Sequence, residues 1–122
     1  MYTAIEIHEN TKKPIEMFEF ATKLGLLMKF RICPKCKKNM KLCSKKSRDG
    51  LRWRCGSKRC KKNEVSIRKN SRFSKLKTEM RSIIRIIYEW SRNTRIKRIK
   101  EETGVDYTAI NSVFEIIRDC LS

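Results

Sequence analysis

Apolar residues recur at helical spacing in three successive runs in the C-terminal part of the chain. A period of about 3.6 residues keeps apolar side chains on one face, so these runs predict helices over about residues 78–93, 95–102 and 106–121. Their expected N-caps are Thr78, Thr94 and Asp106. Gly104, between the second and third runs, can take the left-handed conformation that turns the chain. Three helices in this order, with a short glycine turn, predict a helix-turn-helix.

The middle of the chain has a shorter period. Turn residues alternate with brief runs such as LRWRC (51–55) and NEVSIRK (63–69), in which apolar and polar residues alternate as in narrow strands. A further strand is expected around Leu42 and Cys43. Before this region one short helix is expected, with Pro14 near its start and Gly25 after its end. Its apolar face is expected to contain Met17, Phe20, Ala21 and Leu24.

These elements predict a small α+β protein made of three segments. The segments are one short N-terminal helix within 1–30, a ribbon of short antiparallel strands over 31–72 and the helix-turn-helix over 73–122. A chain of 122 residues has little room for a complex enzyme. No run approaches the roughly 18 to 20 apolar residues of a membrane span, and the N-terminus lacks the residue order of a signal peptide. We therefore expect a reducing compartment, which is the nucleus in a eukaryote and otherwise the cytoplasm or nucleoid.

Positive charge is concentrated in the middle of the chain. The net charge is +18, and residues 31–77 hold nineteen Lys and Arg against two acidic residues. Residues 1–30 are neutral overall, whereas residues 78–122 carry only +1. A compact segment of such charge needs a counter-anion, which the phosphate backbone of nucleic acid supplies. An ordinary charged surface would mix both signs, so the charge pattern favours a nucleic-acid partner.

Four of the six cysteines form two close pairs, Cys33 with Cys36 in CPKC and Cys55 with Cys60 in CGSKRC. Two such pairs across a loop can close a tetrahedron of thiolates around a metal ion, with a proline and a glycine turning the chain. Four sulfur ligands leave no position for water or substrate, so we expect one structural Zn²⁺. A redox C-x-x-C pair or a disulfide framework fits the surrounding residues less well.

Four other residues carry less specific chemistry. Cys43 and Cys120 are expected to pack as small apolar side chains, although the four residues inside the second cysteine pair let Cys43 compete as a ligand. His8, the only histidine, is expected at the surface. Trp53 lies between two arginines. We expect its ring to pack as a cover on the zinc module, and stacking on bases is the alternative.

Nucleic-acid contacts are expected from three groups of residues. The ribbon and the strand after it would contact phosphates through Arg52, Arg54, Lys58, Arg59, Lys61, Lys62, Arg68, Lys69 and Arg72. The second helix of the C-terminal segment would add Arg95, Lys97, Arg98 and Lys100. The outward residues at the start of the third helix would meet base edges, namely Tyr107, Thr108, Asn111 and Ser112. A plain three-helix bundle is the alternative interpretation of this half.

Six stretches of the chain occur in the same order in one known family. They are IEMFEFATKLGLL, CPKCKKNMKL, GLRWRC, CKKNEVSIRKNSRF, IIYEWS and TGVDYTAINSVFEIIRDC. Over about residues 14–121 they resemble the N-terminal region of Merlin-superfamily transposases. The resemblance implies a DNA-binding module for transposon ends, with the four paired cysteines at the family's zinc positions. Arg72 departs from the family pattern, which has an aromatic residue after the position of Ser71.

In that family a metal-dependent nuclease domain with a carboxylate triad follows this region. No segment of the present chain supplies the sheet for such a triad, so we expect a zinc-dependent DNA-binding protein that is not an enzyme. Its expected partner is double-stranded DNA, with an oligomer or a separately encoded catalytic subunit left open. The alternative is an RNA-binding zinc ribbon, because basic ribbons bind both polymers.

Overall fold

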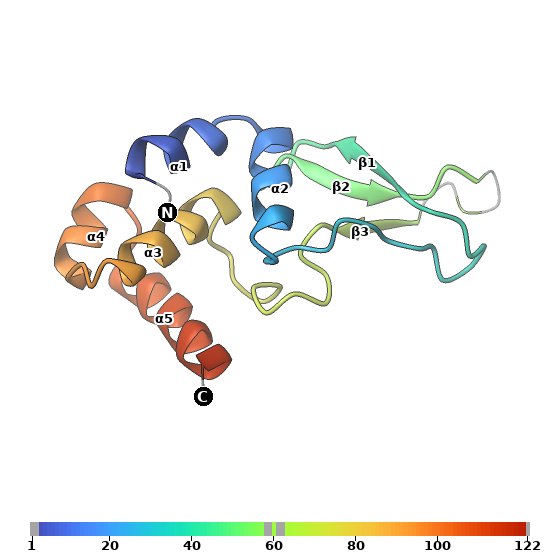
Figure 1. The fold of residues 1–122 in the computed structure, drawn as a ribbon. Helices are drawn as coiled ribbons and strands as arrows, with labels where there is room; N and C mark the ends of the chain where they lie inside the picture. Colours follow the sequence, from blue (N-terminus) through green and yellow to red (C-terminus); the bar gives the residue numbers. More distant parts are fainter. Residues whose placement is uncertain (1–2, 58–59, 61–62, 122) are drawn as a thin grey trace.

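The computed structural model describes residues 3–57, 60 and 63–121, and of residue 121 it describes only the backbone. The molecule divides into a helical half and a β half (Figure 1). The elements are α1 (Ala4–Asn10), α2 (Pro14–Lys23), β1 (Lys41–Ser44), β2 (Leu51–Arg54), β3 (Glu64–Ser66), α3 (Met80–Ser91), α4 (Ile96–Thr103) and α5 (Tyr107–Leu121). Within the described residues these five helices and one three-stranded antiparallel sheet confirm the expected small α+β fold. None of the described helices is long and apolar enough to cross a membrane.

The N-terminal segment contains two helices where the sequence analysis predicted one. The missed helix, α1, begins with a reciprocal cap in which the Glu6 N–H donates to Thr3 Oγ1 (3.1 Å) and the Thr3 N–H donates to Glu6 Oε1 (3.4 Å). This T-x-x-E pattern is a capping box, which the sequence already contained. In α2 the expected apolar face is buried except for Leu24, which follows the helix and is 41% exposed.

The sheet has the order β1-β2-β3, and one of its faces packs on α2. Leu51 and Trp53 alternate along β2 and are both buried, because side chains two apart in a strand share a face. The Trp53 ring meets the Phe18 ring of α2 edge to face, with centroids 5.7 Å apart. This burial confirms the packing interpretation of Trp53. The intervening Arg52 and Arg54 therefore lie on the opposite, outer face of the sheet.

Arg68 was expected to contact phosphate, and this prediction is wrong. The side chain is buried, and its guanidinium holds Asp49 through Nε to Oδ2 (2.6 Å) and Nη2 to Oδ1 (2.8 Å). Its Nη1 also donates to the Leu76 carbonyl (3.0 Å), while Asp49 Oδ1 accepts the N–H of Met80 (2.9 Å). Arg68 therefore has its donors engaged inside the fold. From the segment after β3, Arg68 connects Asp49 of the β1–β2 turn to the residues that lead into α3.

Helices α3, α4 and α5 pack against one another, and their last connection follows the expected chemistry. Gly104 has φ +72°, and the Ala109 N–H donates to Asp106 Oδ1 (2.8 Å), which confirms the glycine turn and the N-cap of α5. The apolar faces of these helices are buried at Met80, Ile83, Ile84, Ile99, Ile110, Val113 and Ile117.

Three expectations for the helical half are wrong. Thr78 does not cap α3, because the helix begins at Met80 and the Asp49 carboxylate accepts the Met80 N–H. Thr94 does not cap α4, because its hydroxyl donates to the carboxylate of Glu89 (2.7 Å). Cys120 is exposed instead of packed, since the C-terminal end of α5 extends past the helices that cover its start (Figure 1).

Candidate metal centre and nucleic-acid interface

The two cysteine pairs meet in a single cluster. The Sγ atoms of Cys33, Cys36, Cys55 and Cys60 all lie within 4.8 Å of one another, and those of Cys36 and Cys55 are 3.4 Å apart. A tetrahedral Zn–S site with bonds of about 2.3 Å would place its sulfurs about 3.8 Å apart. Cys36 is partly exposed and the other three thiols are buried. The donor set and its spacing therefore fit one metal ion.

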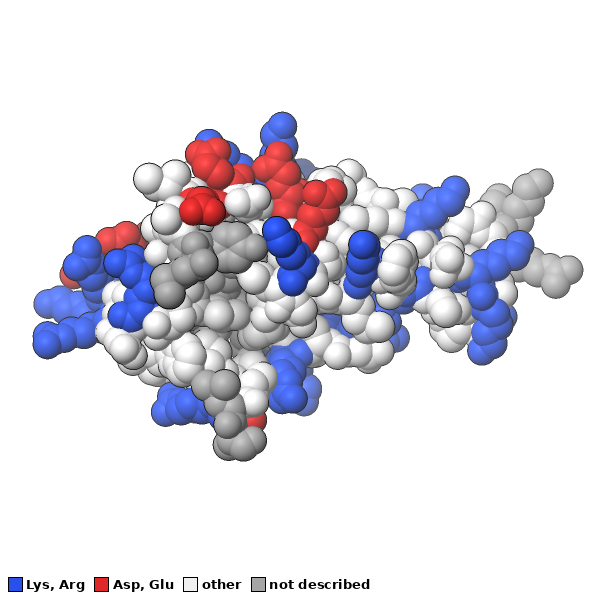
Figure 2. All heavy atoms as spheres, viewed as in Figure 1, with Lys and Arg blue, Asp and Glu red and all other residues white. Residues whose placement is uncertain are grey.

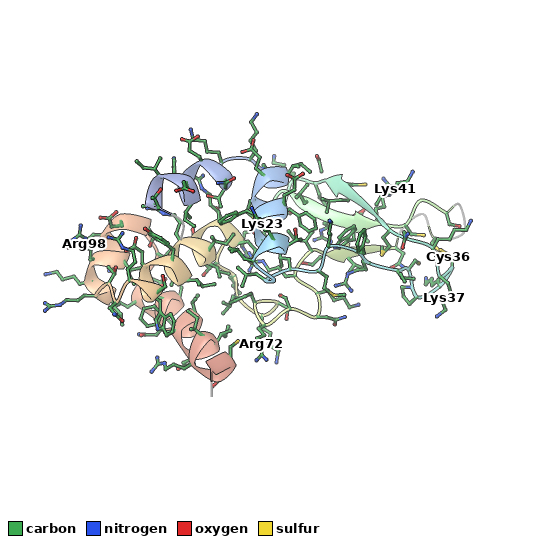
Figure 3. All side chains as sticks on the ribbon, viewed as in Figure 1. Lys23, Cys36, Lys37, Lys41, Arg72 and Arg98 are labelled. Carbon is green, nitrogen blue, oxygen red and sulfur yellow. The ribbon has the colours of Figure 1, made fainter. Side chains whose placement is uncertain are left out.

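Each cysteine pair is presented by a tight backbone turn. In the first, the Lys37 N–H donates to the Cys33 carbonyl (2.9 Å) and the Cys33 N–H donates to the Lys38 carbonyl (2.9 Å). In the second, the Cys60 N–H donates to the Ser57 carbonyl (3.0 Å). The first turn lies at the end of the sheet away from the helices, where Figure 3 labels Cys36 and Lys37.

Asn63 is a member of this site that the sequence analysis missed. Its side-chain amide donates to Cys33 Sγ (3.2 Å), and its backbone N–H donates to the Cys60 carbonyl (2.8 Å). A hydrogen bond to a coordinating thiolate orients it and tunes its charge. The only signal in the sequence is that Asn63 follows the second cysteine pair by three residues.

Hydrogen bonding and burial act in opposite directions on these thiols. The backbone amide of Cys36 stabilises the Cys33 thiolate and lowers the pKa of Cys33 to about 6. Burial raises the pKa of Cys60 to about 12, because a buried thiolate loses its hydration, and hydrogen bonds with the neighbouring cysteine side chains add to the rise. A divalent cation bound between them would hold all four as thiolates.

Cys43 does not belong to this cluster. It lies half-buried on β1, and its Sγ approaches the backbone carbonyl of Lys41 at 3.8 Å. Its side chain points to the outer face of the sheet, opposite Arg52. The structure thus selects Cys33, Cys36, Cys55 and Cys60 from the chain's six cysteines.

The outer face of the sheet is basic. The strand register places Lys41 beside Arg54, and Arg54 beside Glu64 on β3. Like charges directly across strands repel each other. Glu64 is the only acidic residue on the strands, and it is already paired with Lys45 at 2.7 Å, which lowers the pKa of its carboxyl. This face therefore carries more positive than negative side chains.

The other expected phosphate contacts of the middle segment differ in placement. Lys69 and Arg72 are exposed on the segment that follows β3. Arg72 lies between the two halves of the molecule (Figure 3). Lys58, Arg59, Lys61 and Lys62 lie outside the described residues.

The helical half presents the residues that the sequence analysis assigned to it. Exposed cations on α4 are Arg95 at its N-cap, Lys97, Arg98 and Lys100. At the start of α5, Tyr107, Thr108 and Asn111 are exposed, whereas Ser112 is half-buried and its hydroxyl donates to the carbonyl of Thr108 (3.0 Å). The Nζ of Lys100 lies 4.4 Å from the centroid of the Tyr107 ring, which brings the two groups together.

One edge of the molecule is unsuited to a polyanion. Figure 2 shows acidic side chains gathered over α1 and α2, while Lys and Arg occupy the far end of the sheet and the region of α4. The acidic residues of these two helices are Glu6, Glu9, Glu16 and Glu19. His8 is also exposed there, with Nδ1 3.4 Å from an Arg81 nitrogen, as expected of a surface residue.

Comparison of the chain with protein-family models, curated proteins and solved structures gives no match.

Proposed function

We propose that this chain is a zinc-stabilised protein that binds double-stranded DNA, as the end-recognition module of the Merlin-like transposases that its sequence resembles. The observation that carries the proposal is the basic outer face of the sheet, on strands that the four-cysteine cluster ties together. The cluster supports zinc, because four cysteine thiolates in a closed tetrahedron are a typical structural zinc site. Such a site has no open coordination position, so in this proposal the metal stabilises the fold and takes no part in breaking bonds.

Zinc has a clear structural task in this module. The sheet has three strands of three or four residues, which bury few side chains on their own. Structural zinc contributes on the order of 10 kcal/mol to the folding of small zinc-binding peptides, and their metal-free forms are commonly unfolded. The basic face would therefore exist as an ordered surface only in the zinc-bound protein.

The helical half favours duplex DNA over RNA. The exposed residues at the start of α5 suit the major groove of B-form DNA, which admits a helix, whereas the major groove of A-form RNA is too narrow. The cations of α4 lie next to them and suit the flanking phosphates. A catalytic subunit that cuts the DNA would be a separate partner in this proposal.

A binding titration at three salt concentrations, before and after chelation, tests the proposal. Duplex DNA and an RNA hairpin are the two probes. We expect tighter binding of the duplex and complete loss of binding after chelation. Affinity should also fall roughly a thousandfold between about 50 and 200 mM salt if about six phosphates are contacted. Preference for the hairpin would instead identify an RNA-binding zinc ribbon.

Two cysteine variants provide a matched control for the metal. Cys55→Ser removes one cluster thiol and should abolish both bound zinc and DNA binding, because three thiolates no longer close the site. Cys43→Ser removes a thiol of the same sheet that lies outside the cluster and should leave both unchanged. Normal DNA binding by metal-free Cys55→Ser protein would show that zinc is not part of the function.

A further inference from the structure

Three apolar side chains are exposed in a row just before the first cysteine turn. Met28, Phe30 and Ile32 occupy alternate positions and are 48%, 68% and 59% exposed. Leu27 and Cys33, at either end of this row, are buried. In an extended segment the residues that face solvent are usually polar. The exposed apolar side chains of this row add nothing to the core, and such surface is typical of an interaction site.

Contacts of Arg31 and Ile32 hold this segment in place and keep the row exposed. Arg31, within the row, donates from Nη2 to the carbonyl of Lys69 (2.5 Å), and its own carbonyl accepts the N–H of Met40 (2.8 Å). Ile32 forms a β-bridge with Asn39 across the first cysteine turn. A shift by one residue would break these contacts, so the apolar side chains cannot turn inward.

Along the sequence, the row is flanked by cations and by no acidic residue. The Nζ of Lys29 lies 5.7 Å from the centroid of the Phe30 ring. The sequence from Phe20 to Arg48 contains ten Lys and Arg and no Asp or Glu. A partner of this surface must offer apolar faces and negative charge together. Nucleobases with their phosphates do so at every nucleotide, and base–aromatic stacking does not depend on sequence.

The row also adjoins one of the expected phosphate contacts. Met28 and Arg72 line the same hollow, between the segment after α2 and the segment after β3. The bond from Arg31 to the Lys69 carbonyl fixes the same two segments together. A base placed against the row would therefore have its phosphate within the region of Arg72.

We propose that Met28, Phe30 and Ile32 form a base-contacting row, in which the Phe30 ring stacks on an unpaired or unstacked base of the bound DNA. The inference rests on the proposed DNA-binding function. It adds a contact on the β half that recognises accessible bases, whatever their sequence. The ligand is DNA whose bases are accessible, such as a bubble or a frayed end. Apolar side chains that enter disturbed base steps are a known means of holding distorted DNA.

The test compares two DNA probes, a perfect duplex and the same duplex with a central bubble of about four unpaired bases that includes a fluorescent 2-aminopurine. The zinc-loaded protein should bind the bubble about tenfold more tightly, a ratio within the range of one base–aromatic stack. Phe30→Ala should lose this preference, while its affinity for the perfect duplex stays unchanged. Phe30→Trp should retain the preference and the 2-aminopurine fluorescence change, because indole also stacks.

The matched control is Ile5→Ala, which removes an exposed apolar side chain (75% exposed) from α1, on the acidic edge. This variant should keep the bubble preference, and equal zinc content in all variants checks their folding.

Equal affinity of the unaltered protein for both probes, or an unchanged preference in Phe30→Ala, would overturn the inference and leave the proposed function standing. Binding of neither probe at low salt would overturn both. A dimer that Phe30→Ala converts to monomer would overturn the inference by assigning the row to self-association.

Discussion

Among the cations of this chain, position in the fold decides which are free to bind and which hold the protein together. Arg68 and Arg72 are four residues apart in the same basic stretch. Arg72 is exposed, whereas Arg68 is buried with both oxygens of Asp49 on its guanidinium. A buried carboxylate that loses its partner retains its desolvation penalty, so the pair is sensitive to removal of either side.

Arg68→Ala should therefore lower the free energy of unfolding by about 3 to 5 kcal/mol, because it leaves the Asp49 carboxylate buried and uncompensated. Urea unfolding at a fixed free zinc concentration measures this loss. Arg72→Ala is the matched control and should change stability by less than about 0.5 kcal/mol, since exposed side chains contribute little. Equal stability of the two variants would contradict the structural role of Arg68.

The Arg68–Asp49 pair could not be predicted from the sequence. Nothing in the local sequence separates Arg68 from Lys69, and the partner of Arg68 lies 19 residues earlier in the chain. Its assignment as a phosphate contact was wrong because a long-range pair leaves no local pattern. The cysteine cluster was predictable because each of its pairs is local and its chemistry admits few alternatives.

At the scale of elements, the β1–β2 turn docks on the start of α2. Gly50, in this turn, has φ +77°, and a Cβ added there would lie 2.8 Å from Cγ of Pro14. Gly25, after α2, has nearly the same backbone conformation, φ +78°, but a Cβ there would meet nothing within 4 Å. The two glycines thus separate backbone strain from steric contact.

Gly25→Ala should lower the free energy of unfolding by about 1 kcal/mol, the strain of a left-handed alanine. Gly50→Ala should lose a further 1 to 3 kcal/mol or so, because its methyl group also displaces the proline ring. The same urea titration measures both variants. Equal losses would mean that the turn does not press on α2.

The elements were predictable where periodicity and caps agreed. Helix α5 has an apolar stripe, an aspartate cap and a glycine turn before it, and all three are present in the structure. Helix α1 was missed because its seven residues bury only Ile7, so no apolar stripe accompanied the capping box. The expected cap Thr78 failed because a distant residue, Asp49, accepts the Met80 N–H, and Thr94 failed because its hydroxyl donates to Glu89 near the end of α3.

At the scale of the whole molecule, the two halves share one hydrophobic core. A single cluster of buried residues extends from Ile7 through Trp53 of the sheet to Ile117 of α5. The Arg68–Asp49 pair and α2 both bridge the sheet and the helices. A continuous core is typical of one cooperative unit, so a metal ion held by the cysteine cluster at the far end of the sheet should also stabilise the helices.

The two tryptophans of the chain allow a direct test of this coupling, because Trp53 lies in the sheet and Trp90 lies half-buried on α3. Trp90→Phe leaves a fluorescence probe of the β half, and Trp53→Phe leaves one of the helical half. In each variant at fixed free zinc, fluorescence and far-ultraviolet circular dichroism should give the same urea midpoint, because a two-state protein unfolds identically by every probe. Chelation should lower or remove the unfolding transition reported by Trp90 as well as that reported by Trp53. If the Trp90 signal instead keeps its midpoint after chelation, the helices fold independently of the metal module, and the shared core does not couple them.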